Sequence, residues 1–444
     1  MKNFLENKAN KLFIFFIIIT HLSIYINNTV FYLSLFLSIF IFYKINFSLS
    51  NKKDMLIRIL PIHFYIYKFI DSYFKKDLLL WDNQYLFNYF KCKTDTTPHL
   101  TQLTEIVNRC QKTLGFGPAA DLISIKNDPW ISSIIIFSII CIFIIYLLIS
   151  IDEKHIFVFV VFLLSPSFRF LLNSLNSDIF ILCFCLYLYG KHKFSLKIVD
   201  LILISYLTQL KIYPIGLIAG YIVVKFFTKN YKQAFLSTLF FIPNVILLIN
   251  HYIKTSNNYG SFVDGVGGVP TVYAPISTFG LYADYKAYWD VQLTIFERGN
   301  IIIVSCFILL SVFSVIAVLK LKGKYFTFNL DNQDYIKFIT FLPMILLINL
   351  YANFGYKYPL NFLLIFIILK YSNKNLSFFI LSSVLLIPMF YLFNLDYFSQ
   401  KFLITSWFSV VWLLSRYSFY MINFLYSIIA VDFLKDKLNL KISR

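Results

Sequence analysis

Long apolar segments recur along most of the chain and constrain its fold more than any other sequence feature. They run at about Leu12–Ile26, Val30–Ile45, Met55–Ser72, Trp130–Ser150, Ile156–Leu172, Asp178–Gly190, Ile198–Leu210, Ile212–Phe227, Ala234–Ile253, Asn300–Leu321, Lys337–Phe354, Pro359–Tyr371, Leu376–Leu395 and Phe402–Leu434. A straight helix needs about 20 residues to cross a bilayer, so the shorter segments are interpreted as half-helices or tilted helices. Helices satisfy their backbone hydrogen bonds internally, as lipid requires. The pattern predicts an all-α polytopic membrane protein with about 12–14 transmembrane helices.

The composition excludes the other broad classes of protein. Hydrophobic residues make up 59% of the chain and charged residues only 14%. Soluble domains are about 45–50% apolar and about 25% charged, so this chain cannot bury its apolar residues beneath a polar surface. A soluble globular protein, a disordered protein, a collagen and a disulfide-rich mini-protein are therefore all excluded.

Basic residues cluster at the ends of the apolar segments and give the chain a net charge of +18. If the N-terminus is cytoplasmic, the basic clusters fall on the cytoplasmic side, at Lys2–Lys11, Lys52–Lys53, Lys191–Lys197, Lys225–Lys232, Lys320–Lys324, Lys370–Lys374 and Lys435–Arg444. Such a bias orients membrane proteins and attracts anionic lipid. We therefore expect a multi-pass protein of the plasma (inner) membrane with both termini cytoplasmic. Nucleic acid is not expected as a partner, because no basic soluble domain could carry it.

This topology divides the chain into three parts. Residues 1–54 form two N-terminal transmembrane helices, residues 55–434 a transmembrane core, and residues 435–444 a basic cytoplasmic tail. Two long loops, at about 73–129 and 254–299, fall on the outer face. Loops of this length are commonly functional, and their aromatic content argues against disorder.

Cysteine and histidine spacing predicts no metal site and no cofactor. No CxxC or HExxH pattern occurs in the sequence. Cys92 and Cys110 both lie in the first outer loop, where they either form a disulfide on an oxidising face or remain free thiols. The other cysteines, Cys141, Cys183, Cys185 and Cys306, lie in apolar segments, where they are interpreted as core residues.

Ionisable residues at membrane depth are costly and indicate function. The candidates are Asp178, Arg169, Lys211 and Arg416. Lys211 lies in the sequence Leu-Lys-Ile-Tyr-Pro, where the proline breaks the helix and places a cation at the membrane edge. A lysine there can bind a lipid phosphate as a point charge, or it can simply extend to the interface as an anchor. Asp178 and Arg169 can equally form a structural ion pair.

Three segments together resemble a known family. They are the polar turn and span at Asn173–Tyr189, the segment Leu210–Ile215, and Gly115–Pro118 after Cys110. In this order they are similar to the central region of glycosyltransferase family 87, within the GT-C superfamily of integral-membrane glycosyltransferases. The resemblance covers about Cys110–Phe227. The chain differs in two extra apolar segments before the first long loop and in Phe116, where relatives have tyrosine.

The resemblance implies an inverting hexosyltransferase with a GT-C-like fold. Such enzymes take a sugar from a polyprenyl-phosphate donor on the outer face and pass it to a glycan or glycolipid acceptor. An acidic residue near the start of the first outer loop removes the acceptor proton, which here implicates Asp82 or Asp71 ahead of Asp77. A carboxylate within hydrogen-bonding reach can serve as such a base.

Cations near the outer face would stabilise the departing phosphate. Lys211 is the first candidate, followed by Arg298 and Lys357, with Asp178 and Arg169 as further substrate-binding candidates. The second outer loop is rich in glycine and aromatic residues, which suits either an acceptor-binding lid or an interfacial aromatic belt.

Two other functions remain open at this point. An O-antigen or polysaccharide polymerase or ligase also has many spans and a large outer loop. A flippase or transporter of lipid-linked sugars is expected to contain internal repeats and several charged residues near the membrane midplane. The sequence shows neither feature clearly.

Overall fold

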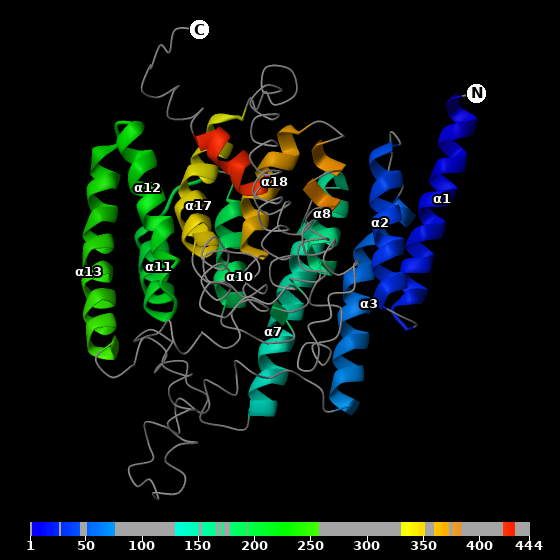
Figure 1. The fold of residues 1–444 in the computed structure, drawn as a ribbon, viewed down its shortest axis with the longest axis horizontal. Helices are drawn as coiled ribbons and strands as arrows, with labels where there is room; N and C mark the ends of the chain where they lie inside the picture. Colours follow the sequence, from blue (N-terminus) through cyan, green and yellow to red (C-terminus); the bar gives the residue numbers. More distant parts are fainter. Residues whose placement is uncertain are drawn as a thin grey trace, which may run out of the picture.

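The computed structural model describes residues 2–25, 28–44, 51–75, 129–150, 153–165, 168, 171–172, 178–191, 193–256, 330–350, 359–372, 376–378, 380–382 and 421–430. Within these residues all regular secondary structure is helical, so the all-α part of the predicted fold is confirmed there. Figure 1 shows the helices standing side by side in a bundle.

The helices follow the apolar segments of the sequence. They are α1 (Lys2–Ser23), α2 (Asn28–Lys44), α3 (Asn51–Lys75), α7 (Pro129–Ser150), α8 (Glu153–Leu164), α10 (Asp178–Gly190), α11 (Ile198–Leu210), α12 (Ile215–Phe227), α13 (Tyr231–Ser256), α17 (Asn332–Leu350) and α18 (Phe362–Tyr371). Residues Met421–Ala430 are also helical.

One helix among the described residues is long and apolar enough by itself to cross a membrane. It lies within α13, over Tyr231–Asn250, and has 20 residues. The other apolar helices are shorter, with 10–17 residues in their apolar parts.

The two ends of the bundle are easily told apart in Figure 1. At the lower end α3 and α13 end and α7 begins. The chain therefore leaves the bundle at this end where each of the two long outer loops is predicted to start. At the upper end a tight turn joins α12 to α13. Because the successive helices α10–α13 alternate in direction, Asp178 and the connection 211–214 lie at the lower end, and the connection 191–197 lies at the upper end.

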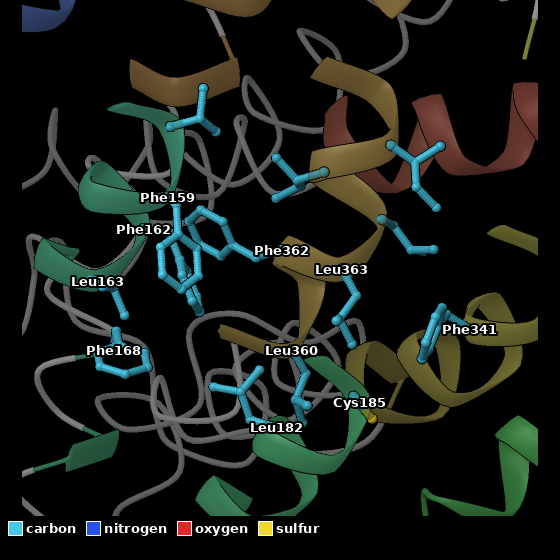
Figure 2. Packing of buried hydrophobic residues seen from close by; sticks show 14 of the residues in the cluster. Phe159, Phe162, Leu163, Phe168, Leu182, Cys185, Phe341, Leu360, Phe362 and Leu363 are labelled. Carbon is cyan, nitrogen blue, oxygen red and sulfur yellow. The ribbon is translucent and has the colours of Figure 1, made fainter. Parts of the chain in front are cut away.

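Aromatic side chains fill the centre of the bundle. Figure 2 shows Phe162 of α8 packed against Phe362 of α18, with ring centroids 4.2 Å apart. Phe168 adds an edge-to-face contact to Phe162 at 5.1 Å. On α10, Leu182 and Cys185 are fully buried in the same cluster, and the Sγ of Cys185 lies 3.9 Å from the Sδ of Met344. Such packing stabilises the bundle through many van der Waals contacts.

The helices α12 and α17 pack in close contact. Gly216 and Gly220 are one turn apart on α12, and a Cβ on either would lie 2.3–2.8 Å from backbone atoms of α17. The backbone atoms concerned belong to residues 339–344. Small residues spaced four apart allow such an approach between helices in lipid. This contact fixes α12, and with it the connection at either end of the helix.

Polar contacts join the end of α1 to the middle of α3. His21 Nδ1 of α1 lies 3.0 Å from His63 Nδ1 of α3, and Tyr25 hydrogen-bonds His63 through its hydroxyl. Further up α3, the Arg58 guanidinium donates to the carbonyl of Leu148 in the last turn of α7. A cation is favourable at a helix C-terminus, where carbonyl groups lack helical partners.

Candidate functional site

The connection between α11 and α12 carries the lysine that the sequence singles out. Lys211 closes α11, because its N–H donates to the carbonyl of Leu207 at 2.9 Å and its backbone then turns to an extended conformation. Pro214 follows immediately before α12, and its carbonyl accepts from the N–H of Leu217 at 3.0 Å. A proline suits this position because its fixed φ matches a helix start and its missing N–H costs no hydrogen bond.

Tyr213 joins this connection to the start of α10. Its hydroxyl donates to Oδ1 of Asp178, the first residue of α10. Asp178 is fully buried and Tyr213 is buried beside it. A carboxylate is favoured at a helix N-terminus by the helix dipole, and the tyrosine hydroxyl offsets part of its desolvation. Two segments that lie 35 residues apart in the chain therefore meet in space.

Lys211 and Ile212 lie on the outer side of this junction. Lys211 is half-buried and Ile212 is 63% exposed. The buried Asp178–Tyr213 pair thus forms the inner support of the connection, and Lys211 lies nearer to the lower surface of the bundle. This arrangement can hold a cation beside a ligand without exposing the carboxylate.

A polar group next to Lys211 was not predicted from the sequence. Gln209 donates through Nε2 to Oδ1 of Asn244 on α13 at 2.7 Å, and Asn244 donates through Nδ2 to Oγ of Ser205 at 2.8 Å. Gln209 Oε1 and the hydroxyl of Thr208 are buried and have no hydrogen-bond partner among the residues that the structure describes. Buried polar atoms are normally paired, so these two atoms are exceptions among the described residues. The signal was the sequence Thr-Gln-Leu-Lys itself, which carries two polar side chains just before the cation.

The predicted site residues fall into two groups. Asp178 and Lys211 are brought to one junction by Tyr213, and Asp71 lies in the C-terminal part of α3, which also reaches the lower end of the bundle. The remaining candidates lie outside the described residues: Asp82, Arg169, Arg298 and Lys357, together with Asp77, Arg416, Cys92, Cys110 and Cys306. The roles assigned to both groups stay predictions.

Among the described residues no group of three or more histidine, cysteine or acidic side chains is placed to hold a metal ion. The described cysteines, Cys141, Cys183 and Cys185, are free thiols on α7 and α10. No family model, no curated protein and no solved structure matches the chain.

Proposed function

We propose that the chain is a membrane-embedded glycosyltransferase. It would move a sugar from a polyprenyl-phosphate donor to a glycan or glycolipid acceptor. The observation that carries the proposal is the Tyr213–Asp178 hydrogen bond, which joins the two family-like segments and leaves Lys211 towards the lower surface. That surface is also where α3 and α13 lead into the two long loops predicted on the outer face.

The membrane location is supported by side chains on the outside of the bundle. Large apolar residues are 51–67% exposed along one side of α13, among them Phe235, Leu239, Ile242 and Ile246. A water-facing protein rarely exposes so extended an apolar face, whereas lipid covers it at no cost. Shorter apolar helices such as α10 and α11 would then cross a locally thinned bilayer or form part of longer spans.

The reaction assigns one role to each group. The acceptor hydroxyl attacks the anomeric carbon of the sugar, the bond from that carbon to the phosphate oxygen breaks, and the configuration inverts. The proton passes to the carboxylate of Asp82 or Asp71, which acts as general base. The polyprenyl phosphate leaves with the bonding electrons, and Lys211 stabilises its growing charge, with Arg298, Lys357 and Arg169 as further cations.

Asp178 and Tyr213 act in this scheme as positioning residues. Asp178 is fully buried, so it is suited to fixing Tyr213 rather than to removing a proton from an acceptor. Tyr213 is two residues from Lys211 in the same connection, so fixing its ring also fixes the lysine backbone. Holding a reacting group in the correct position can account for a large part of an enzyme's rate enhancement.

The test is sugar transfer in membranes that contain the chain, supplied with radiolabelled polyprenyl-phosphate sugars. Lys211→Ala should lower transfer about 100-fold or more, as for loss of other groups that stabilise transition-state charge. Lys225→Ala, which removes a lysine from the opposite end of α12, should leave transfer close to normal. Equal transfer by the Lys211 variant and the unaltered chain would reject the phosphate assignment.

The general base is tested separately with Asp82→Asn and Asp71→Asn. Each change keeps the side-chain shape and removes the proton acceptor, so one of them should abolish transfer while donor binding persists. Normal turnover in both variants would reject the proposed base. No labelled lipid-linked or glycan-linked product from any polyprenyl-phosphate sugar would reject the glycosyltransferase.

A further inference from the structure

Two connections meet at the upper end of α10–α13. The hydroxyl of Tyr221, in the middle of α12, accepts a hydrogen bond from the N–H of Leu196 at 3.2 Å. The same hydroxyl donates to Oε1 of Gln233, in the first turn of α13, at 3.1 Å. One buried tyrosine therefore holds the α10–α11 connection beside the α12–α13 turn.

These connections present four exposed lysines, which we call the lysine rim: Lys193, Lys197, Lys229 and Lys232. The neighbouring Lys191 differs, because its ammonium group pairs with the buried carboxylate of Asp200 at 2.6 Å. Among the residues that the structure describes, no ion pair neutralises a member of the rim. The rim is therefore a surface of uncompensated positive charge.

The backbone at Lys229 is unusual for a lysine. Its φ is 57°, and within the described part of the chain it is the one non-glycine residue with a positive φ. The N–H of Asn230 donates to the carbonyl of Lys225 at 2.9 Å, and that of Lys229 to Phe226 at 3.0 Å. This is the Schellman arrangement, in which the left-handed position is normally a glycine because a Cβ is disfavoured there. A lysine thus occupies a position where glycine would stabilise the turn.

Apolar side chains border the rim directly. Phe226 and Tyr231 are each 58% exposed and make an edge-to-face contact with ring centroids 5.8 Å apart. Ile198 and Val199, at the start of α11, are 54% and 65% exposed. Lysines next to exposed aromatic and aliphatic side chains are typical of a protein surface at the boundary between lipid tails and headgroups.

We propose that the lysine rim binds the phosphate groups of anionic phospholipids in the leaflet that borders the upper end of the bundle. The inference rests on the membrane location in the proposed function but not on sugar transfer. Each lysine would act as a point charge towards a headgroup, while Phe226 and Tyr231 contact the adjoining acyl chains. The positive φ of Lys229 places one of these charges on the turn itself.

The probe is phosphatidylglycerol added to the purified full-length chain in a neutral detergent, with phosphatidylcholine as the reference lipid. The Tm of the unaltered chain should rise more with phosphatidylglycerol, because only that lipid carries a net negative charge. Replacing all four rim lysines by glutamine should weaken apparent binding of phosphatidylglycerol about tenfold or more. The matched control is Lys435→Gln, Lys437→Gln, Lys441→Gln and Arg444→Gln, which removes the same charge from the tail and should weaken apparent binding of phosphatidylglycerol much less than the rim variant does.

Lys229→Gly separates lipid binding from folding. Glycine suits the left-handed turn, so this variant should have a higher Tm without lipid and a smaller rise with phosphatidylglycerol. A structural role alone would raise the Tm and leave the lipid response intact, and that result would remove Lys229 from the site.

Three other results would overturn the proposal that the lysine rim binds anionic phospholipids. They are an unchanged lipid response in the rim variant, an equal loss in the tail control, and equal stabilisation by inorganic phosphate. Failure of the proposed function would look different. The chain would then transfer no sugar, but the rim variant would still lose its response to phosphatidylglycerol.

Discussion

The upper and lower ends of the bundle hold buried carboxylates by different means. At the upper end Asp200 pairs with Lys191 at 2.6 Å, and Asp334 pairs with Lys370 at 2.6 Å. At the lower end Asp178 is held by a neutral tyrosine hydroxyl, and the lysine nearest in sequence to that tyrosine lies towards the surface. An ion pair neutralises both partners and fixes them in place. At the lower end the contact described for Asp178 is instead a hydrogen bond from Tyr213, and we propose that the charge of Lys211 serves the ligand.

The two ends are connected through α12, so the largest effect is expected where α12 meets α17. Gly216→Val places a Cβ and two methyl groups against the backbone near Met344, at distances that no rotamer can relieve. We expect loss of the folded chain, or destabilisation well above the roughly 1–3 kcal/mol of ordinary overpacking. The measurement is the yield of monodisperse protein and its Tm in detergent.

Gly190→Ala serves as the control for this change. Nothing lies within 4 Å of a Cβ added at Gly190, so the variant should keep both yield and Tm. Normal folding of Gly216→Val would mean that the α12–α17 contact does not hold the two ends together.

The second prediction concerns the lower end alone. Tyr213→Phe removes the hydroxyl that donates to Asp178 and should lower the free energy of unfolding by about 1–3 kcal/mol, the cost of depriving a buried carboxylate of a donor. Sugar transfer should fall further than this stability loss accounts for, because the Lys211 connection is no longer fixed. The comparison is transfer per folded molecule at a temperature well below the Tm.

Tyr206→Phe is the matched control, since Tyr206 is a half-buried tyrosine of the neighbouring helix α11. It should change neither stability nor transfer appreciably. Full sugar transfer by Tyr213→Phe would show that transfer does not depend on this tyrosine. The two ends would then not differ in the way proposed.

The third prediction concerns the upper end. Asp200 accepts from the Lys191 ammonium group and, at 2.7 Å, from the backbone N–H of Lys197 at the start of α11. Asp200→Asn should lower the free energy of unfolding by about 1–2 kcal/mol, from loss of the cap and of the ion pair. Transfer per folded molecule should remain normal. A selective loss of transfer would place a role in sugar transfer at the upper end, where we infer none.

Local features of the sequence predicted the positions of the helices well. The bounds of α10 and α11 coincide with the apolar segments predicted there, because polar or charged residues mark both ends. Prolines explain two differences. The helix α8 stops at Leu164, ahead of Pro166, rather than at Leu172, and α12 begins after Pro214 rather than at Ile212. The residue before a proline is biased away from helical backbone, and a proline favours the first turn of a helix.

Contacts between distant segments could not be predicted in the same way. Periodicity indicates which residues are apolar, but it does not say that Tyr213 lies against Asp178 or that α12 packs on α17. One signal was nevertheless present, because Gly216 and Gly220 are four residues apart in an apolar segment, the spacing that permits close helix packing. Lys211 was identified from the break at Pro214, whereas its support by Tyr213 depends on a contact across 35 residues.

The smallest effect is expected at Asp331, where the upper end meets water. Burial alone would raise the pKa of this carboxyl, but hydrogen bonds from the Asp334 N–H, the Tyr371 hydroxyl and the Lys370 ammonium outweigh burial and lower the pKa to about 2. The unfolded chain has an ordinary pKa of about 3.9. A lowered pKa contributes stability above pH 4, and that contribution is lost as the pH falls through about 2.

The contribution itself is small, because the side chains of Asp331 and Lys370 are 53% and 42% exposed and solvent screens their pairing. Asp331→Asn should therefore lower the free energy of unfolding by less than about 1 kcal/mol at pH 7. The Tm difference between the variant and the unaltered chain should stay constant from pH 7 to pH 5 and then shrink as the pH falls towards 2. A difference that grows with acid would have the wrong sign. It would mean that the upper end does not hold Asp331 as a carboxylate, and the contrast with the lower end would then rest on Asp200 and Asp334 alone.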